Sequence, residues 1–512
     1  MRRVALLVLL LGPWAGAVAW AAEAPAEIAW FDGGVEAAFA KARAESKPVF
    51  LFWGAVWCPY CADLKAHVFS RPDFVEKLDL FVPVYLDGDD PGAQKWAETF
   101  DVAGYPTVLA LAPDGAELAR IAGGMDVRVY DDMLDLVLGD VRPIDAVLRS
   151  VDAAALTAED CRRLAYNGWG LEDVEPAAGA QLAATLAKAA ERCASSGRAE
   201  AARLTAIAAS YALGSEADAL AGGASPSPLL GDLVGRVGEV VADPVLAASV
   251  ADALQYLGED FFVLARRLAP EQAPELLSNW SEAMTAASRD ERYGEGDRLA
   301  AERSKVEAVK ALGGGEGVPA PLEAEARALI EETLGKVQNT PARPGAVNGA
   351  VNLLVALGDP AAAYAIAERE MRRSKTPYYQ MADLAALEEM MGHLETAIVW
   401  LERAYRASKG PATRFQWGTN FVRGLIRMTP GDEAAIREAA IEVLGELEGP
   451  DRIYRRTRAR LETLDASLRE WNADGAHAEA IDAIRQRIAN ICASVPKSEH
   501  DALESCEKFL SS

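Results

Sequence analysis

The stretch Trp57-Cys58-Pro59-Tyr60-Cys61 follows a short apolar run, Pro48-Val49-Phe50-Leu51-Phe52-Trp53. The apolar run predicts a buried strand, and the cysteines fall where that strand would turn into a helix. Two thiols separated by two residues at such a turn can form and open a disulfide without disturbing the fold. The stretch therefore predicts thiol redox chemistry.

Cys58 is expected to cap the following helix, where unpaired backbone N–H groups and the positive helix end favour a thiolate. Pro59 would occupy the first helical turn, where a missing N–H costs nothing. Cys61 lies one turn further in and is expected to be more shielded. We therefore expect Cys58 to attack a partner's disulfide and Cys61 to resolve the mixed disulfide.

The surrounding pattern predicts alternating strands and helices. A turn at Pro113-Asp114-Gly115 joins two hairpin strands, and Pro106 opens the first of them, where a cis, turn-forming proline is tolerated. The predicted elements are a helix over 35–44, the strand over 48–53, a helix after the cysteines, a strand over 80–86, a helix over 93–100, strands over 108–111 and 118–122, and a helix over 126–138.

This part of the chain, residues 28–140, resembles the thioredoxin superfamily. The resemblance rests on the cysteine stretch, on Tyr105-Pro106-Thr107 at the place of the family's cis-proline loop, and on the order of elements. The run 68–75 is similar to periplasmic thiol:disulfide interchange proteins of the DsbD type, and Cys-Pro-Tyr-Cys is similar to glutaredoxins. The resemblance implies that Pro106 is cis and lies against the cysteine pair. It implies substrate contacts from Trp57, Pro59, Tyr60, Tyr105 and Pro106.

One position departs from the family pattern. Thioredoxins usually carry a buried aspartate six residues before the first cysteine, and here that residue is Phe52. Asp63, Lys65 and His67 fall on the following helix, so no buried base is expected beneath the thiols. Water would then carry the proton of the resolving thiol, or the pair would turn over slowly.

A static disulfide and half of a zinc site are the alternative interpretations of Cys58 and Cys61. A zinc site needs a second pair at similar spacing, which the other cysteines lack. His67, His393, His477 and His500 show no metal-ligand spacing, and no glycine-rich phosphate loop is evident, so neither a metal nor a dissociable cofactor is expected.

The remaining cysteines are candidates for structural disulfides, with free thiols as the alternative. Cys161 and Cys193 could tie two helices together, and a bond between Cys492 and Cys506 would pin the C-terminal end. An even number of cysteines, six, is consistent with an oxidising compartment.

Residues 1–22 have the pattern of a secretory signal peptide. Arg2-Arg3 precede an apolar core over 4–11, and small residues continue to Ala21-Ala22. Cleavage there predicts a periplasmic or secreted protein, whereas an uncleaved segment would anchor the chain in a membrane. The balance of 52 basic and 77 acidic side chains, a net charge of −25, argues against nucleic acid as a partner.

From about residue 141 the composition changes to Ala, Leu, Glu and Arg, which predicts an all-helical region. The glycine-rich segment at 313–319 is the predicted boundary between a middle domain, 141–312, and a C-terminal domain, 320–512. The predicted fold is therefore an α/β thioredoxin-like domain, with a central mixed sheet flanked by helices, followed by a larger all-α region.

A weak repeat marks the C-terminal domain. Gly358 and Gly392 lie about 34 residues apart, the length of a tetratricopeptide repeat, and each is followed by an alanine, Ala363 or Ala397. The segment resembles tetratricopeptide repeats. Only two units keep the register, so a generic helical bundle is the alternative; a solenoid would present a concave surface to another protein.

The features together predict an exported thiol–disulfide oxidoreductase. Its partners would be protein thiol or disulfide clients and an upstream thiol electron donor or acceptor, with the helical region binding the client. The alternative function is a helical adaptor or scaffold whose thioredoxin-like domain senses redox state or is vestigial.

Overall fold

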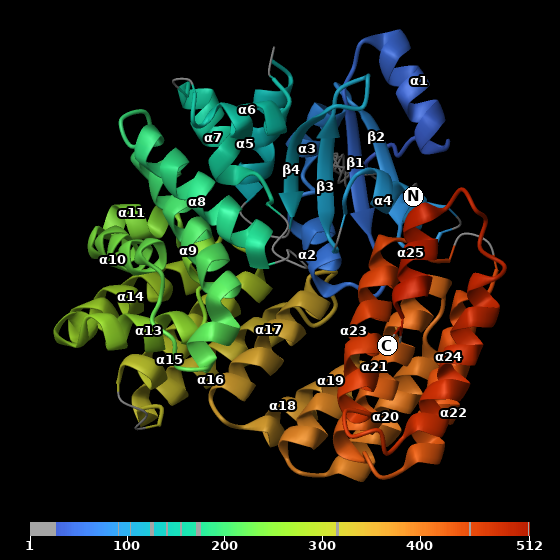
Figure 1. Cartoon of the computed structure of the whole chain (residues 1–512). Helices are drawn as coiled ribbons and strands as arrows, with labels where there is room; N and C mark the ends of the chain where they lie inside the picture. Colours follow the sequence, from blue (N-terminus) through green and yellow to red (C-terminus); the bar gives the residue numbers. More distant parts are fainter. Residues whose placement is uncertain are drawn as a thin grey trace, which may run out of the picture.

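The computed structural model describes residues 27–90, 92–102, 104–122, 127–139, 142–153, 156–169, 176–313, 317–449, 452–509 and 511. The predicted signal peptide, 1–22, lies outside the described residues. The chain has a small α/β domain and a much larger helical region that curves from one side of this domain to the other (Figure 1). Each helix of the described part is too short or too polar to span a bilayer.

A four-stranded mixed sheet forms the centre of the α/β domain. β1 (Val49–Gly54) lies between its parallel neighbour β2 (Val82–Asp87) and its antiparallel neighbour β3 (Thr107–Leu111), and β4 (Glu117–Ala122) follows beside β3. Leu51 pairs with Val84 on one side and with Leu109 on the other. All of β1 is buried, as expected for a central strand covered on both faces.

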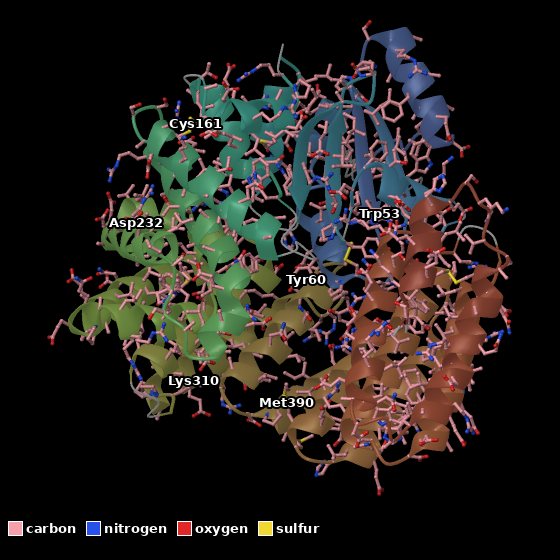
Figure 2. The ribbon with its side chains drawn as sticks, in the orientation of Figure 1. Trp53, Tyr60, Cys161, Asp232, Lys310 and Met390 are labelled. Carbon is pink, nitrogen blue, oxygen red and sulfur yellow. A yellow bond between two sulfur atoms is a disulfide. The ribbon has the colours of Figure 1, made fainter. Side chains whose placement is uncertain are left out.

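The two faces of the sheet are covered by α1 (Val35–Glu45), α2 (Pro59–His67), α3 (Pro72–Leu78), α4 (Ala93–Thr99) and α5 (Val127–Val137). Successive side chains of a strand point to opposite faces. Phe50 and Phe52 therefore join the core beneath α2, α3 and α5, while Leu51 and Trp53 join the core beneath α1 and α4. Figure 2 labels Trp53 inside the domain.

The predicted fold class and order of elements are confirmed, with two local corrections. The strand expected over 80–86 begins at Val82, because Leu80 belongs to the turn after α3 and is 51% exposed. The single helix expected after the cysteines is two helices, α2 and α3. Pro72 starts the second, because a proline is favoured in the first turn of a helix.

The helical region contacts the α/β domain at several places. It begins with α6 (Ile144–Ser150) beside β4 and α7 (Ala158–Tyr166) beside α5. Further along the chain, α17 (Arg343–Ala356) lies against α2, and α23 (Arg455–Trp471) lies beside α4 (Figure 1). The helical region therefore touches the α/β domain on several sides, including the helix that follows the cysteines.

The other helices of this region are α8 (Pro176–Cys193), α9 (Arg198–Ala221), α10 (Pro228–Ala242), α11 (Pro244–Ser249), α12 (Ala251–Leu254), α13 (Glu259–Leu268), α14 (Ala273–Ser288), α15 (Glu295–Leu312), α16 (Ala320–Lys336), α18 (Pro360–Met371), α19 (Tyr378–Met390), α20 (Leu394–Ala407), α21 (Pro411–Met428), α22 (Glu433–Leu444), α24 (Ala478–Cys492) and α25 (His500–Lys508). Two short 3₁₀ helices, Pro270–Gln272 and Gly445–Leu447, complete the described set.

Helix α15 links the cores on both sides of the predicted boundary at 313–319. Its Ala301 and Ala308 pack with the helices before it, while Leu299 and Val306 pack with α16 and α17. Apolar packing thus continues through α15 into the following helices, and the division into domains 141–312 and 320–512 stays a prediction.

The two glycines of the proposed repeat lie in turns between consecutive helices. Gly358 joins α17 to α18 with φ +83°, and Gly392 joins α19 to α20 with φ +81°. Glycine adopts this left-handed conformation without a steric penalty. Ala363 and Ala397 are fully buried, so their small side chains allow close helix contacts. The tetratricopeptide resemblance itself stays a prediction.

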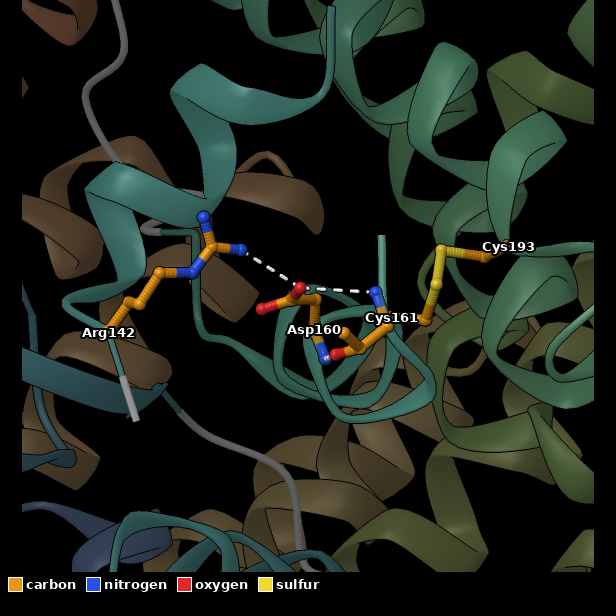
Figure 3. The surroundings of a disulfide bond; sticks show 5 residues. Arg142, Asp160, Cys161 and Cys193 are labelled. Carbon is orange, nitrogen blue, oxygen red and sulfur yellow. Dashed lines mark hydrogen bonds and ion pairs between the residues drawn. A yellow bond between two sulfur atoms is a disulfide. The ribbon is translucent and has the colours of Figure 1, made fainter. Parts of the chain in front are cut away.

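Two disulfides join neighbouring helices of this region. Cys161 of α7 is bonded to Cys193 of α8, and Cys492 of α24 is bonded to Cys506 of α25. Beside the first bond, the Asp160 carboxylate accepts hydrogen bonds from Arg142 and from the backbone N–H of Thr157, which caps α7 (Figure 3). These contacts hold the beginning of the helical region together.

Replacing Cys161 and Cys193 together by alanine should lower the free energy of unfolding by about 3 kcal/mol, because the bond constrains the unfolded chain. The Cys492→Ala/Cys506→Ala pair is the matched control, since its bond closes a shorter loop, with sequence separation 14 against 32, and should cost less. Urea unfolding followed by circular dichroism measures both. An unchanged midpoint in the first variant would show that packing alone holds α7 on α8.

Candidate redox site

Cys58 and Cys61 lie at the first turn of α2 and form a disulfide. Cys58 is the N-cap residue, Pro59 occupies the first helical position, and the backbone N–H of Cys61 points at the Cys58 sulfur at 3.0 Å. The predicted cap geometry is therefore present. When the disulfide is open, the same N–H and the helix dipole would stabilise a thiolate at Cys58.

The Tyr105–Pro106 peptide is cis and lies next to this turn. The ring of Tyr105 stacks on Trp53 at 5.8 Å and meets the ring of Trp57 edge-on at 5.7 Å. Trp57 directly precedes Cys58. The loop and the cysteine turn are thus brought together, as the thioredoxin resemblance implied.

The indole of Trp57 packs against the helical region. Its Nε1 donates a hydrogen bond to Thr413 Oγ1 of α21 at 2.9 Å. Its ring stacks on Tyr379 of α19 at 5.9 Å and meets Trp417 of α21 at 6.1 Å. Residues from distant parts of the chain therefore cover the residue beside the disulfide.

Asp89 completes this contact from the α/β domain. The carboxylate of Asp89 accepts hydrogen bonds from both the backbone N–H and the hydroxyl of Thr413. Thr413 therefore joins Asp89 to Trp57. Asp89 lies in the turn after β2, and its carboxylate binds the first turn of α21.

Tyr60, between the two cysteines, contacts a second pair of helices. Its hydroxyl accepts a hydrogen bond from Asn348 of α17 at 3.1 Å, and the Asn348 carbonyl oxygen accepts one from Tyr379 of α19 at 3.4 Å. Burial raises the pKa of Tyr60, so its hydroxyl stays protonated over a wide range of pH. Figure 2 places Tyr60 at the end of α2 that faces α17.

Arginines of α23 approach the same site from the other side. Arg456 lies over the ring of Tyr105, with its guanidinium carbon 4.4 Å from the ring centre, and Arg458 pairs with Glu98 of α4 at 2.8 Å. Arg455 pairs with Asp101. Opposite charges thus hold α23 beside the cis-proline loop.

Both cysteines are buried. Cys58 is 4% exposed and Cys61 is 2% exposed. Cys61 is shielded, as expected, but Cys58 is buried as well in this arrangement of the chain. Both cysteines belong to the core of the α/β domain, and α17, α19 and α21 pack on the neighbouring Trp57 and Tyr60, which the local sequence does not reveal.

A cavity of about 790 Å³ borders the site. Tyr60, Tyr105 and Pro106 form one wall, and α6, α7, α9 and α12 supply much of the rest, including an ion pair at 2.6 Å between Arg203 and Asp252. The cavity has many aromatic side chains: Tyr60, Tyr105, Tyr130, Tyr166, Trp169 and Tyr256. An extended, partly apolar chain segment would suit these walls.

A buried carboxylate is present on α2, but it does not lie beneath the thiols. Phe52 is apolar and buried as predicted, but Asp63 is only 1% exposed. Burial raises its pKa well above the usual range. Asp63 is two residues beyond Cys61, so the two side chains point to different sides of the helix and Asp63 faces α15 and α17 instead of the thiols.

His67 contacts the helical region. It is half-buried, and its Nε2 lies 2.7 Å from Glu295 of α15. Asp63, His67 and Glu295 bring one possible metal-ligand atom each to within 4.8 Å of one another. The sequence showed no such set because its third member comes from a distant helix.

Comparison with known proteins singles out the α/β domain. Residues 35–138 match the family model of a thioredoxin-like domain. The chain is 30% identical over 96 residues to thiol:disulfide interchange protein DsbD 1 of Pseudomonas aeruginosa, covering 18% of this chain and 16% of that protein. It is 31% identical over 102 residues to DsbD of Pseudomonas fluorescens, covering 19% and 17%. The chain thus spans about a sixth of the length of these relatives.

A solved structure of a DsbH oxidoreductase aligns with 22% of this chain and 87% of that chain, at 21% identity and a TM-score of 0.20. The family match covers the same residues that carry the mixed sheet, the cysteine turn and the cis-proline loop. Residues 35–138 therefore form a thioredoxin-like domain.

Proposed function

We propose that this protein is an exported thiol–disulfide oxidoreductase that exchanges disulfides with protein clients. The observation that carries the proposal is a cysteine pair at a helix start beside a cis-proline loop, with a backbone N–H aimed at the first sulfur. The similarity of this domain to thiol:disulfide interchange proteins supports it. The composition of residues 1–22 supports export.

In the reducing direction, the Cys58 thiolate attacks one sulfur of a client disulfide. A mixed disulfide forms, and the other client sulfur leaves as a thiolate. The Cys61 thiolate then attacks the Cys58 sulfur, which releases the second client thiol and closes the Cys58–Cys61 bond. An upstream dithiol must reduce this bond before the next cycle, and client oxidation runs the same steps backwards.

The cavity beside Tyr105 and Pro106 offers a place for the client segment. It lies between the cis-proline loop and the first helices of the helical region, and its aromatic walls can pack on an extended chain. Val56 is 70% exposed and adds an apolar contact at the edge of the cysteine turn. The helical region would thus select clients by shape as well as cover the sulfurs.

The burial of both sulfurs favours a second candidate function. The buried cysteine pair beside Trp57 could serve as a redox sensor within a helical adaptor, or it could be vestigial. The two functions predict different properties of the disulfide. A working oxidoreductase must exchange it with other thiols at a useful rate and potential, whereas an adaptor could lose both cysteines and keep its partner.

The reduction potential of Cys58–Cys61 should lie between about −270 and −120 mV, the range of known oxidoreductases. Equilibration with glutathione or thioredoxin buffers, followed by alkylation and mass spectrometry of the peptide with both cysteines, measures it. A potential below about −300 mV would place the bond among structural disulfides and support the adaptor.

Cys61→Ala should accumulate a mixed disulfide between Cys58 and a client, because the resolving thiol is missing. Expression in the exported compartment and non-reducing electrophoresis would show larger species that collapse with dithiothreitol. The matched control is Cys58→Ala/Cys61→Ala, which should trap nothing. Equal patterns from the two variants would argue against client exchange through Cys58.

Thr413→Val should speed the reduction of Cys58–Cys61 by dithiothreitol about tenfold. The substitution removes the hydroxyl that accepts a hydrogen bond from the Trp57 indole and donates one to Asp89. Losing these bonds should destabilise the packing of α21 on Trp57 by about 1–2 kcal/mol, which corresponds to roughly a tenfold change in an equilibrium constant. Timed alkylation followed by peptide mass spectrometry measures the rate. Thr185→Val is the control, since Thr185 is only half-buried, lies far along the chain from the redox site and bonds to Gln181 of its own helix. Equal rates in the parent and in Thr413→Val would show that the packing of α21 on Trp57 does not limit the access of dithiothreitol to the disulfide.

A further inference from the structure

The carboxylate of Asp63 is buried without a partner. Its side chain is 1% exposed, and neither of its oxygens accepts a hydrogen bond. Leaving a buried polar group unpaired costs about 1–3 kcal/mol, and more when it is charged. A residue held this way at the contact between two parts of the chain requires a physical explanation.

Two glycines of the helical region make room for this carboxylate. A Cβ atom placed on Gly296 of α15 would lie 2.9 Å from Asp63 Oδ2, and one on Gly345 of α17 would overlap the carboxylate. Asp63 therefore fits into a space that any larger residue at either position would fill. The space is closed by backbone, and backbone atoms of α15 and α17 offer Asp63 no hydrogen bond.

His67 lies one helical turn beyond Asp63, on the same face of α2. Its Nδ1 is 3.0 Å from the backbone oxygen of Asp63, and its Nε2 is 2.7 Å from Glu295 Oε2. Since the backbone oxygen only accepts, Nδ1 must carry a proton. Nε2 then faces a carboxylate oxygen, so either a second proton or a cation must lie between them.

This orientation is the one that metal-binding histidines adopt. Such histidines donate one ring N–H to a carbonyl or carboxylate oxygen and coordinate through the other nitrogen. The three ligand atoms lie within 4.8 Å of one another, so a cation about 2.0–2.2 Å from each requires only modest side-chain movement. Glu295 and His67 are partly exposed, which leaves a path for the ion and for water.

The local charge also favours a cation. Asp297 adds a further carboxylate near Asp63, and one of its oxygens accepts a hydrogen bond from Tyr256 at 3.2 Å. Glu295 and Asp297 therefore both lie near Asp63, and Glu295 also pairs with the imidazole of His67. A divalent ion would compensate this charge and give Asp63 the partner it lacks.

We propose that Asp63, His67 and Glu295 bind a divalent transition-metal ion of the zinc class, with water completing its coordination. One imidazole and two carboxylates suit Zn²⁺, whereas Ca²⁺ and Mg²⁺ prefer oxygen ligands alone. Two ligands come from α2 of the thioredoxin-like domain and one from α15 of the helical region. The ion would join the helix that follows the cysteines to the region that covers them.

The full chain, stripped of metal and with its disulfides intact, should bind one equivalent of Zn²⁺ in a calorimetric titration. His67→Gln and Glu295→Gln should each weaken binding by about 100-fold or more. The matched control is His477→Gln, because His477 also pairs with a glutamate, Glu433, at 2.9 Å but lies outside the site. Zn²⁺ should raise the midpoint of thermal unfolding of the parent and of His477→Gln, but not of His67→Gln.

The Cys58→Ser/Cys61→Ser variant keeps the test independent of the redox function. It should bind Zn²⁺ as the parent does, whereas loss of binding in this variant would assign the ion to the thiols and overturn the site. Absence of saturable binding, equal binding by His67→Gln, or displacement of Zn²⁺ by a tenfold excess of Ca²⁺ would each overturn the proposal. None of these outcomes depends on whether Cys58 exchanges disulfides.

Discussion

The contact between the Trp57 indole and helices α19 and α21 holds the two parts of this chain together at the redox site. One face of the ring stacks on Tyr379, its edge meets Trp417, and its N–H bonds to Thr413. Aromatic side chains of this size contribute strongly to buried interfaces. Because Trp57 directly precedes Cys58, the free energy of this contact also opposes exposure of the disulfide.

Under the proposed function, this arrangement would couple client access to movement of the helical region. A client approaching Cys58 would either use the cavity beside the cis-proline loop or displace the helices that pack on Trp57. Displacement costs the client part of its binding free energy, so weakly bound disulfides would be excluded. The cover would then give selectivity to a reaction that any accessible thiolate can perform.

The helical region contacts α2 near both of its ends. At the start of the helix it meets Trp57 and Tyr60, and towards the end it meets Asp63 and His67. The first contact depends on aromatic packing and hydrogen bonds between neutral groups. The second depends on charge. Conditions that change the charge at the second contact, above all a bound cation, would therefore alter how firmly the helical region holds the helix that begins at the cysteines.

Local sequence was sufficient to predict the α/β domain, the cap at Cys58 and the place of Pro106, because these depend on strand periodicity, turn chemistry and residues close in the chain. The helical character of the remainder followed from composition alone. Tertiary structure decided that both sulfurs are buried, that Asp89 binds Thr413, and that Asp63 and His67 meet Glu295. These contacts join residues hundreds of positions apart, and no periodic pattern or local spacing marks such partners before the helices pack.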